Sequence, residues 1–213
     1  MFHFPSWTLT LRDLSGLVAV GALLYVIVFV WFGFSPKTTD VGYQPHQPVA
    51  YSHKLHAGDL GIDCRYCHTT VEHAGHAAVP PTATCMNCHS MIHTESPKLQ
   101  LVRESASTGE PIPWVRVHDL PDYVYFNHSA HLAAGVGCAS CHGRVDQMEE
   151  VHQDKPLSMG WCLECHRNPE PNIRPVSEIT NMAYDPTAHE GLGAELLAER
   201  GIAPKQNCST CHR

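Results

Sequence analysis

The sequence predicts a loop-rich domain of few short helices, with little or no sheet, that packs around bound groups and follows one transmembrane helix. Three observations predict this fold. All 10 cysteines lie in repeats of Cys-x-x-Cys-His, and 15 glycines and 16 prolines interrupt regular structure along the chain. In addition, residues 14–34 carry no charged side chain and are mostly apolar.

The Cys-x-x-Cys-His motifs are typical of c-type haem attachment, in which both thiols bond to the porphyrin and the histidine ligates the iron. A four-ligand zinc site needs two Cys-x-x-Cys pairs and gives no role to a histidine after every pair. Disulfides across such short steps leave the histidines unexplained as well. We therefore expect five covalently attached haem c groups. The attachment residues are Cys64, Cys67, Cys85, Cys88, Cys138, Cys141, Cys162, Cys165, Cys208 and Cys211, and the proximal iron ligands are His68, His89, His142, His166 and His212.

Residues 14–34 are predicted to form a transmembrane helix, because about 20 apolar residues span a hydrocarbon core of roughly 30 Å. A signal peptide is the alternative, but its apolar region is shorter and ends at small residues, which Trp31 to Phe34 do not provide. Arg12 and Lys37 give almost no basic asymmetry. Haem attachment on the oxidising side of a bacterial inner membrane then predicts a single-pass protein, with residues 1–13 in the cytoplasm and the haem domain in the periplasm.

A proline-containing polar linker is predicted over residues 35–50, and a pentahaem domain over 51–213. Within this domain a His-x-x-His pair and two haem motifs occur twice at nearly constant offsets, which indicates duplicated two-haem modules over 51–117 and 118–180. The fifth motif, 208–212, follows them. Short helices are expected over 96–104 and over 188–200, the second with a capping box of Thr187 and Glu190.

The composition restricts what kind of core the domain can form and which classes of partner it can bind. A formal net charge of −7, to which haem propionates add, leaves no basic surface for nucleic acid. The polypeptide available for each haem is too short to build an ordinary side-chain core as well. We therefore expect the porphyrins to form the core and to be required for folding. We expect protein partners, together with membrane lipid around the helix.

The sixth ligand of each iron comes from outside the motifs. A His-x-x-His pair on one helical turn directs its rings towards two different irons, and its repetition before both modules predicts His53, His56, His128 and His131 as distal ligands. Surface histidines or a metal clip are the alternatives. His118, among aromatic and β-branched residues, is the predicted fifth distal ligand. The competing candidates are His189, His152, Met148 and Met159, and a methionine ligand would raise the haem potential.

Four arginines within or just after motifs are candidates for pairing with propionates, or are ordinary solvated charges. They are Arg65, Arg144, Arg167 and Arg213. No Cys-x-x-Cys-Lys variant of a haem reductase occurs. Because six-coordinate haems bind no substrate, we expect electron transfer and no catalytic residue on this chain.

The chain resembles a known family. Tyr-Ser-His-Lys-Leu-His-Ala-Gly-Asp with Cys-Arg-Tyr-Cys-His, Cys-Met-Asn-Cys-His, Tyr-Phe-Asn-His-Ser-Ala-His and the segment from Leu157 to Arg167 resemble the pentahaem cytochrome c subunits (ActA) of bacterial alternative complex III. The half-modules are similar to class III cytochromes c, such as cytochromes c3 and c7, in which paired histidines are distal ligands.

This resemblance implies an electron-carrying subunit of a menaquinol-oxidising complex. The implied partners are integral-membrane quinol-oxidising subunits, an iron–sulfur subunit related to molybdopterin oxidoreductases, and a monohaem cytochrome c or a terminal oxidase. Two alternatives stay open. The first is a stand-alone membrane-anchored quinol dehydrogenase that feeds a periplasmic reductase, and the second is a haem enzyme such as a nitrite reductase.

Overall fold

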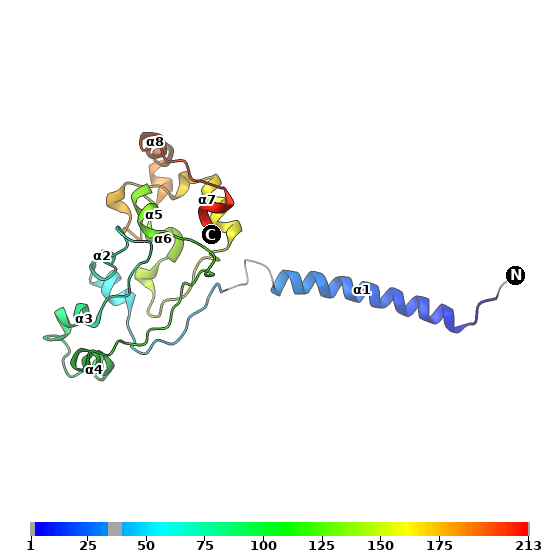
Figure 1. Cartoon of the computed structure of the whole chain (residues 1–213), viewed down its shortest axis with the longest axis horizontal. Helices are drawn as coiled ribbons and strands as arrows, with labels where there is room; N and C mark the ends of the chain where they lie inside the picture. Colours follow the sequence, from blue (N-terminus) through cyan, green and yellow to red (C-terminus); the bar gives the residue numbers. More distant parts are fainter. Residues whose placement is uncertain (1–2, 34–39, 213) are drawn as a thin grey trace. The chain divides into compact units, whose positions relative to one another are not determined.

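The computed structural model describes residues 3–33 and 40–212, and it divides into two compact units, Met1–Val41 and Gly42–Arg213 (Figure 1). Each unit is considered by itself. The predicted end of the membrane helix at Phe34, the linker residues 35–39 and the candidate propionate partner Arg213 lie outside the described residues.

The N-terminal unit consists of one long helix, α1, from Trp7 to Gly33. Its start is earlier than the predicted residue 14. The first turn is closed by Thr8, whose backbone N–H and hydroxyl both donate to the Pro5 carbonyl, at 3.0 and 2.7 Å. Its window from Thr10 to Gly33 has a mean hydropathy of 2.4, and none of it is buried, so the helix is a candidate membrane span by length and composition.

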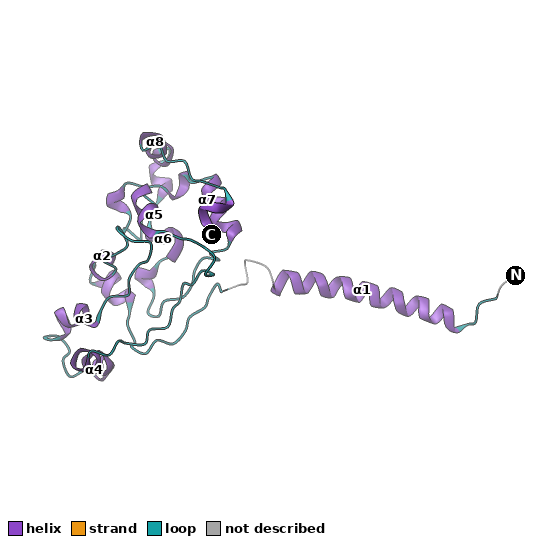
Figure 2. Ribbon diagram, in the orientation of Figure 1, coloured by secondary structure: helices purple, strands orange, loops and turns teal. Residues whose placement is uncertain are grey.

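The C-terminal unit contains short helices joined by long loops, as Figure 2 shows. Apart from isolated bridges from Val124 to His212 and from Val136 to Ile173, residues 40–212 form no β pairing. The prediction of short helices without a sheet is therefore confirmed. The α-helices are α2 (Cys64–Cys67), α3 (Thr82–His89), α4 (Gln100–Thr108), α5 (His128–Ala134), α6 (Cys138–His142), α7 (Met159–Arg167), α8 (Leu192–Glu199) and α9 (Cys208–Cys211).

The helix expected over 188–200 was predicted too long. Residues 186–189 form a separate 3-10 turn, and Gly191 has φ of 80°, a left-handed conformation that separates this turn from α8. The capping prediction was also wrong. The Asp185 carboxylate, rather than Thr187, caps the turn by accepting from the Thr187 N–H at 2.9 Å. The helix expected over 96–104 is likewise divided, into a 3-10 turn over 97–99 and α4.

The side-chain core of the C-terminal unit is thin. One cluster of Val49, Val102 and Ile112 lies beneath α3 and α4, and the other buried apolar side chains are dispersed. A domain of this length ordinarily buries most of the surface that its unfolded chain exposes. The thin core is consistent with large apolar groups that complete it. The dispersed buried side chains are Leu132, Met148, Ile173, Ile179 and Leu196.

Candidate haem sites

Each Cys-x-x-Cys-His motif lies on or ends a short helix. Positions i and i+3 share one face of a helix, so both thiols of a motif are presented to the same side and the histidine follows at the helix end. All ten cysteines are free of disulfides. Within the described ranges no three His, Cys, Asp or Glu side chains gather into a metal-binding group of the kind that zinc would need.

The motif histidines are oriented through their Nδ1 atoms. In four of the five, Nδ1 lies within hydrogen-bonding distance of a backbone carbonyl. A ring that donates from Nδ1 keeps its lone pair on Nε2, which is the atom that an iron requires. The contacts are His68 with Ala78 at 2.9 Å, His89 with Ile92 at 3.0 Å, His166 with Lys205 at 2.7 Å and His212 with Tyr123 at 3.3 Å.

Three of the four histidines in the two His-x-x-His pairs are held in the same way. Nδ1 of His56 faces the Ser52 carbonyl, and Nδ1 of His131 faces the Asn127 carbonyl, both at 2.8 Å. Nδ1 of His128 faces the carbonyl of Gly75, also at 2.8 Å. These rings therefore also direct Nε2 away from the backbone.

Distances between the rings test whether these residues fit a haem iron. Two imidazoles bound to one metal through nitrogen atoms at about 2 Å have ring centroids roughly 6 Å apart. The observed centroid distances are 6.3 Å for His56 and His89, 6.4 Å for His128 and His142, and 6.1 Å for His131 and His166. Each pair leaves the space that one iron needs, so the residues fit the group.

His53 completes the series. Burial, followed by the proximity of His68, lowers the pKa of His53 to about 4, which favours the neutral form of the ring. Its Nδ1 is buried without a hydrogen-bond partner. His53 thus lies near the first motif and His56 faces the second, while His128 faces the third and His131 the fourth.

His118, the predicted fifth distal ligand, lies beside the histidine of the third motif. Its ring centroid is 4.4 Å from that of His142, nearly perpendicular, and its Nε2 lies 3.4 Å from Nδ1 of His142. This separation is too short for an iron between the rings. The fifth motif has a different neighbour, because the ring of His212 stacks on Tyr123 at 5.9 Å.

The competing candidates for the fifth distal ligand lie in varied surroundings. Met148 is only 8% exposed, whereas Met159, at the start of α7, is 65% exposed. The ring of His189 stacks on Tyr184 at 5.2 Å. His152 lies close enough to His118 to lower the pKa of His118, after the larger effect of burial.

Polar contacts join the motifs in a definite order. The first and second motifs meet where Asn87 donates to the Tyr66 hydroxyl at 3.0 Å. The first and third are joined through residues 179–180, since Cys138 N–H donates to Ile179 and the Thr180 hydroxyl donates to Asp63, both at 2.9 Å.

The remaining motifs continue this order. His128 and His131 on α5 face the third and fourth motifs. The fourth motif contacts the segment before the fifth, because Nδ1 of His166 meets the Lys205 carbonyl. Burial, and then the thiols of Cys165 and Cys162, raise the pKa of Cys141 to about 12, which agrees with adjacent third and fourth sites. The order of neighbours is thus second, first, third, fourth, fifth.

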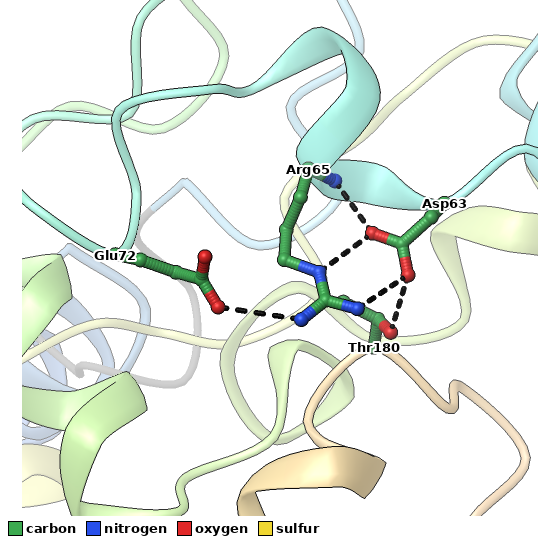
Figure 3. Close-up of polar contacts among 4 residues, drawn as sticks. All are labelled: Asp63, Arg65, Glu72 and Thr180. Atoms are coloured by element: carbon green, nitrogen blue, oxygen red, sulfur yellow. Dashed lines mark hydrogen bonds and ion pairs between the residues drawn. The ribbon is translucent and has the colours of Figure 1, made fainter.

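Two of the arginines considered as propionate partners are already paired with carboxylates. Asp63 caps α2 through the Arg65 N–H at 2.8 Å and holds the Arg65 guanidinium at 2.9 and 3.0 Å, while Glu72 contacts it at 3.3 Å (Figure 3). The side-chain hydrogen bond from Arg65 is the main reason that the pKa of Asp63 falls to about 2. Arg144 is similarly held by Asp146 at 2.7 and 2.8 Å.

Arg174 was not identified from the sequence, where no motif marks it. It is only 5% exposed, lies 4.5 Å from the centre of the Tyr184 ring, and donates to the Asn181 carbonyl at 3.2 Å. Its guanidinium packs directly against Gly137, the residue before Cys138. A Cβ added to Gly137 would overlap the guanidinium.

Gly137→Ala is therefore expected to destabilise the haem-loaded domain by about 1–3 kcal/mol, because the buried guanidinium must move. Thermal denaturation followed by circular dichroism measures this. Gly160→Ala is the matched control, since a Cβ at Gly160 meets no atom within 4 Å. Equal melting temperatures for the two variants would contradict the packing described for Arg174.

Two comparisons with known proteins agree with these sites. Residues 124–213 match the family described as cytochrome c7 and related cytochrome c. The multihaem cytochrome c subunit of a menaquinone reductase from Nitratidesulfovibrio vulgaris is 35% identical over 167 residues, which are 68% of this chain and 78% of that protein.

Proposed function

The chain belongs to the multihaem cytochromes c, with covalently bound haem, and from that premise we propose that it carries electrons through five haems between a membrane quinone site and a periplasmic acceptor. The observation that carries this proposal is the spacing of the three histidine pairs, 6.1 to 6.4 Å between ring centroids. When bound, each haem supplies a one-electron iron centre. Where two histidines would hold one iron, as in these three pairs, the iron would have no position for a substrate.

The contribution of the chain itself is orientation. Backbone carbonyls that accept from Nδ1 fix the tautomer of most ligand histidines in the folded chain, which leaves the lone pair of Nε2 for an iron. Burial, and then His118 and His128, lower the pKa of His142 to about 3, which favours the neutral imidazole that a metal binds. No residue in this arrangement needs to make or break a covalent bond during turnover.

We further propose that the chain is the pentahaem subunit of a menaquinol-oxidising complex of the alternative complex III type. In this proposal α1 crosses a bacterial inner membrane once and the haem unit is periplasmic. The proposed partners are integral-membrane quinol-oxidising subunits, an iron–sulfur subunit and a monohaem cytochrome c. The name of the relative, menaquinone reductase, favours a second candidate in which electrons move in the opposite direction, from a cytochrome to menaquinone.

The test uses the complex isolated from membranes through a tag on this chain. Mass measurement of the chain is expected to show five attached haems, and anaerobic mixing with menaquinol is expected to reduce them within turnover time. Rapid menaquinone reduction by a pre-reduced cytochrome c, with no haem reduction by menaquinol, would instead support the second candidate. The chain purified alone is the control, and its direct reduction by menaquinol would favour the stand-alone quinol dehydrogenase. Fewer than five haems would contradict the proposal.

A further inference from the structure

The motif histidine of the third site differs from the other four in what faces its Nδ1. In the other four motifs this atom meets a backbone carbonyl. In the third motif, Nδ1 of His142 meets Nε2 of His118, at 3.4 Å, with the two rings nearly perpendicular at 83°. With the ring centroids 4.4 Å apart, the edge of one ring meets the face of the other near these two nitrogen atoms.

The two sides of His142 therefore have different neighbours. His118 lies on the Nδ1 side, at a centroid distance of 4.4 Å, while His128 lies 6.4 Å away at the spacing that an iron requires. An iron between His142 and His128 leaves His118 outside the coordination sphere.

The surroundings of His118 suit an acceptor. The His118 ring is half-buried and lies against the ring of His142. A neutral imidazole nitrogen is a more basic acceptor than an amide carbonyl. A stronger acceptor on Nδ1 raises the basicity of a metal-bound histidine, which stabilises the oxidised metal.

We propose that His118 is a positioning residue of the third haem site, which accepts a hydrogen bond from His142 and thereby holds that haem at a lower potential, and that it is not the fifth distal ligand. This inference rests on the proposed haem loading. The third site stands in the middle of the order of neighbours derived from the motif contacts, so its potential affects every electron that passes from one module to the other.

The experiment compares variants of the full chain within its complex. His118→Leu removes the acceptor, and His118→Gln supplies an amide oxygen near the position of Nε2. Potentiometric titration of the visible spectrum and electron paramagnetic resonance are measured for each. His118→Leu is expected to keep five low-spin haems and to make one midpoint potential more positive, with a change in its reduction equilibrium of roughly tenfold, or about 59 mV. His118→Gln is expected to restore at least half of that shift.

The control is His46→Gln, because the His46 side chain is 87% exposed and its partner Glu150 lies 3.9 Å away. This variant is expected to leave all potentials unchanged. A high-spin ferric signal in His118→Leu would show that His118 ligates an iron and would overturn the inference, as would five unchanged potentials.

Wild-type haem content and spin state test the proposed function separately. If His118→Leu does not mature with five haems, His118→Gln is compared with His118→Asn, whose shorter amide does not reach His142. The potential is then expected to rise only in His118→Asn, and equal potentials in the two variants would overturn the inference.

Discussion

The chain produced without haem attachment is expected not to fold beyond α1. The C-terminal unit buries few hydrophobic side chains, with one small cluster around Val102 and the others dispersed. Hydrophobic burial is the main favourable contribution to folding, and a chain that lacks most of it does not offset the conformational entropy of ordering its backbone. We expect no cooperative thermal transition and rapid proteolysis throughout residues 42–213.

This expectation is checked by expression with and without the haem attachment machinery, followed by circular dichroism and limited proteolysis in the same detergent. The haem-loaded chain is the control and is expected to melt cooperatively. The helical signal of α1 should be present in both samples, which shows that the haem-free chain was inserted and recovered intact. A cooperative transition of the haem-free unit would contradict the prediction.

Local chemistry explains what the sequence could predict. A haem attachment motif is defined within five consecutive residues, and an apolar membrane segment by the composition of about 20. The absence of a sheet also follows from local features, since prolines and glycines interrupt every apolar stretch after residue 40. These features need no knowledge of the tertiary structure.

The errors arise where distant residues or backbone geometry decide. Thr187 and Glu190 have a capping-box spacing, but the left-handed Gly191 ends the turn and α8 starts beyond it. The sequence neighbours of His118 also do not show that its ring contacts His142 of α6. Arg174 has no signature because its role depends on the approach of Gly137.

The arrangement of the histidine pairs could be predicted from the sequence only in part. Spacing alone predicts that His128 and His131 serve two irons, since they lie on one turn of α5. Which motif each histidine faces depends on how α5 packs between α6 and α7. The structure places His56 opposite His89, His128 opposite His142 and His131 opposite His166, and His53 lies near His68.

His131→Ala is expected to open the fourth haem site and to interrupt electron transfer. The ring of His131 faces His166 at 6.1 Å, and its Nδ1 is fixed by the Asn127 carbonyl, so no neighbouring residue replaces it without moving α5. One haem of five is expected to become high-spin and to bind carbon monoxide. Turnover of the complex is expected to fall by roughly 10- to 100-fold, because loss of an iron ligand changes both the reduction potential of the haem and the reorganisation energy of electron transfer at that site.

His131→Met provides the discriminating comparison. A thioether can restore six-coordination and is expected to keep that haem low-spin, but with a more positive potential than the histidine-ligated site, so electrons remain there and turnover stays slow. His46→Ala is the matched control, because the His46 side chain is 87% exposed and is not a candidate ligand. Absorbance with carbon monoxide, electron paramagnetic resonance and turnover are measured for all three. If His131→Ala remains wholly low-spin, the pairing of His131 with His166 is contradicted, and the order of neighbouring sites loses its link between the third and the fourth motif.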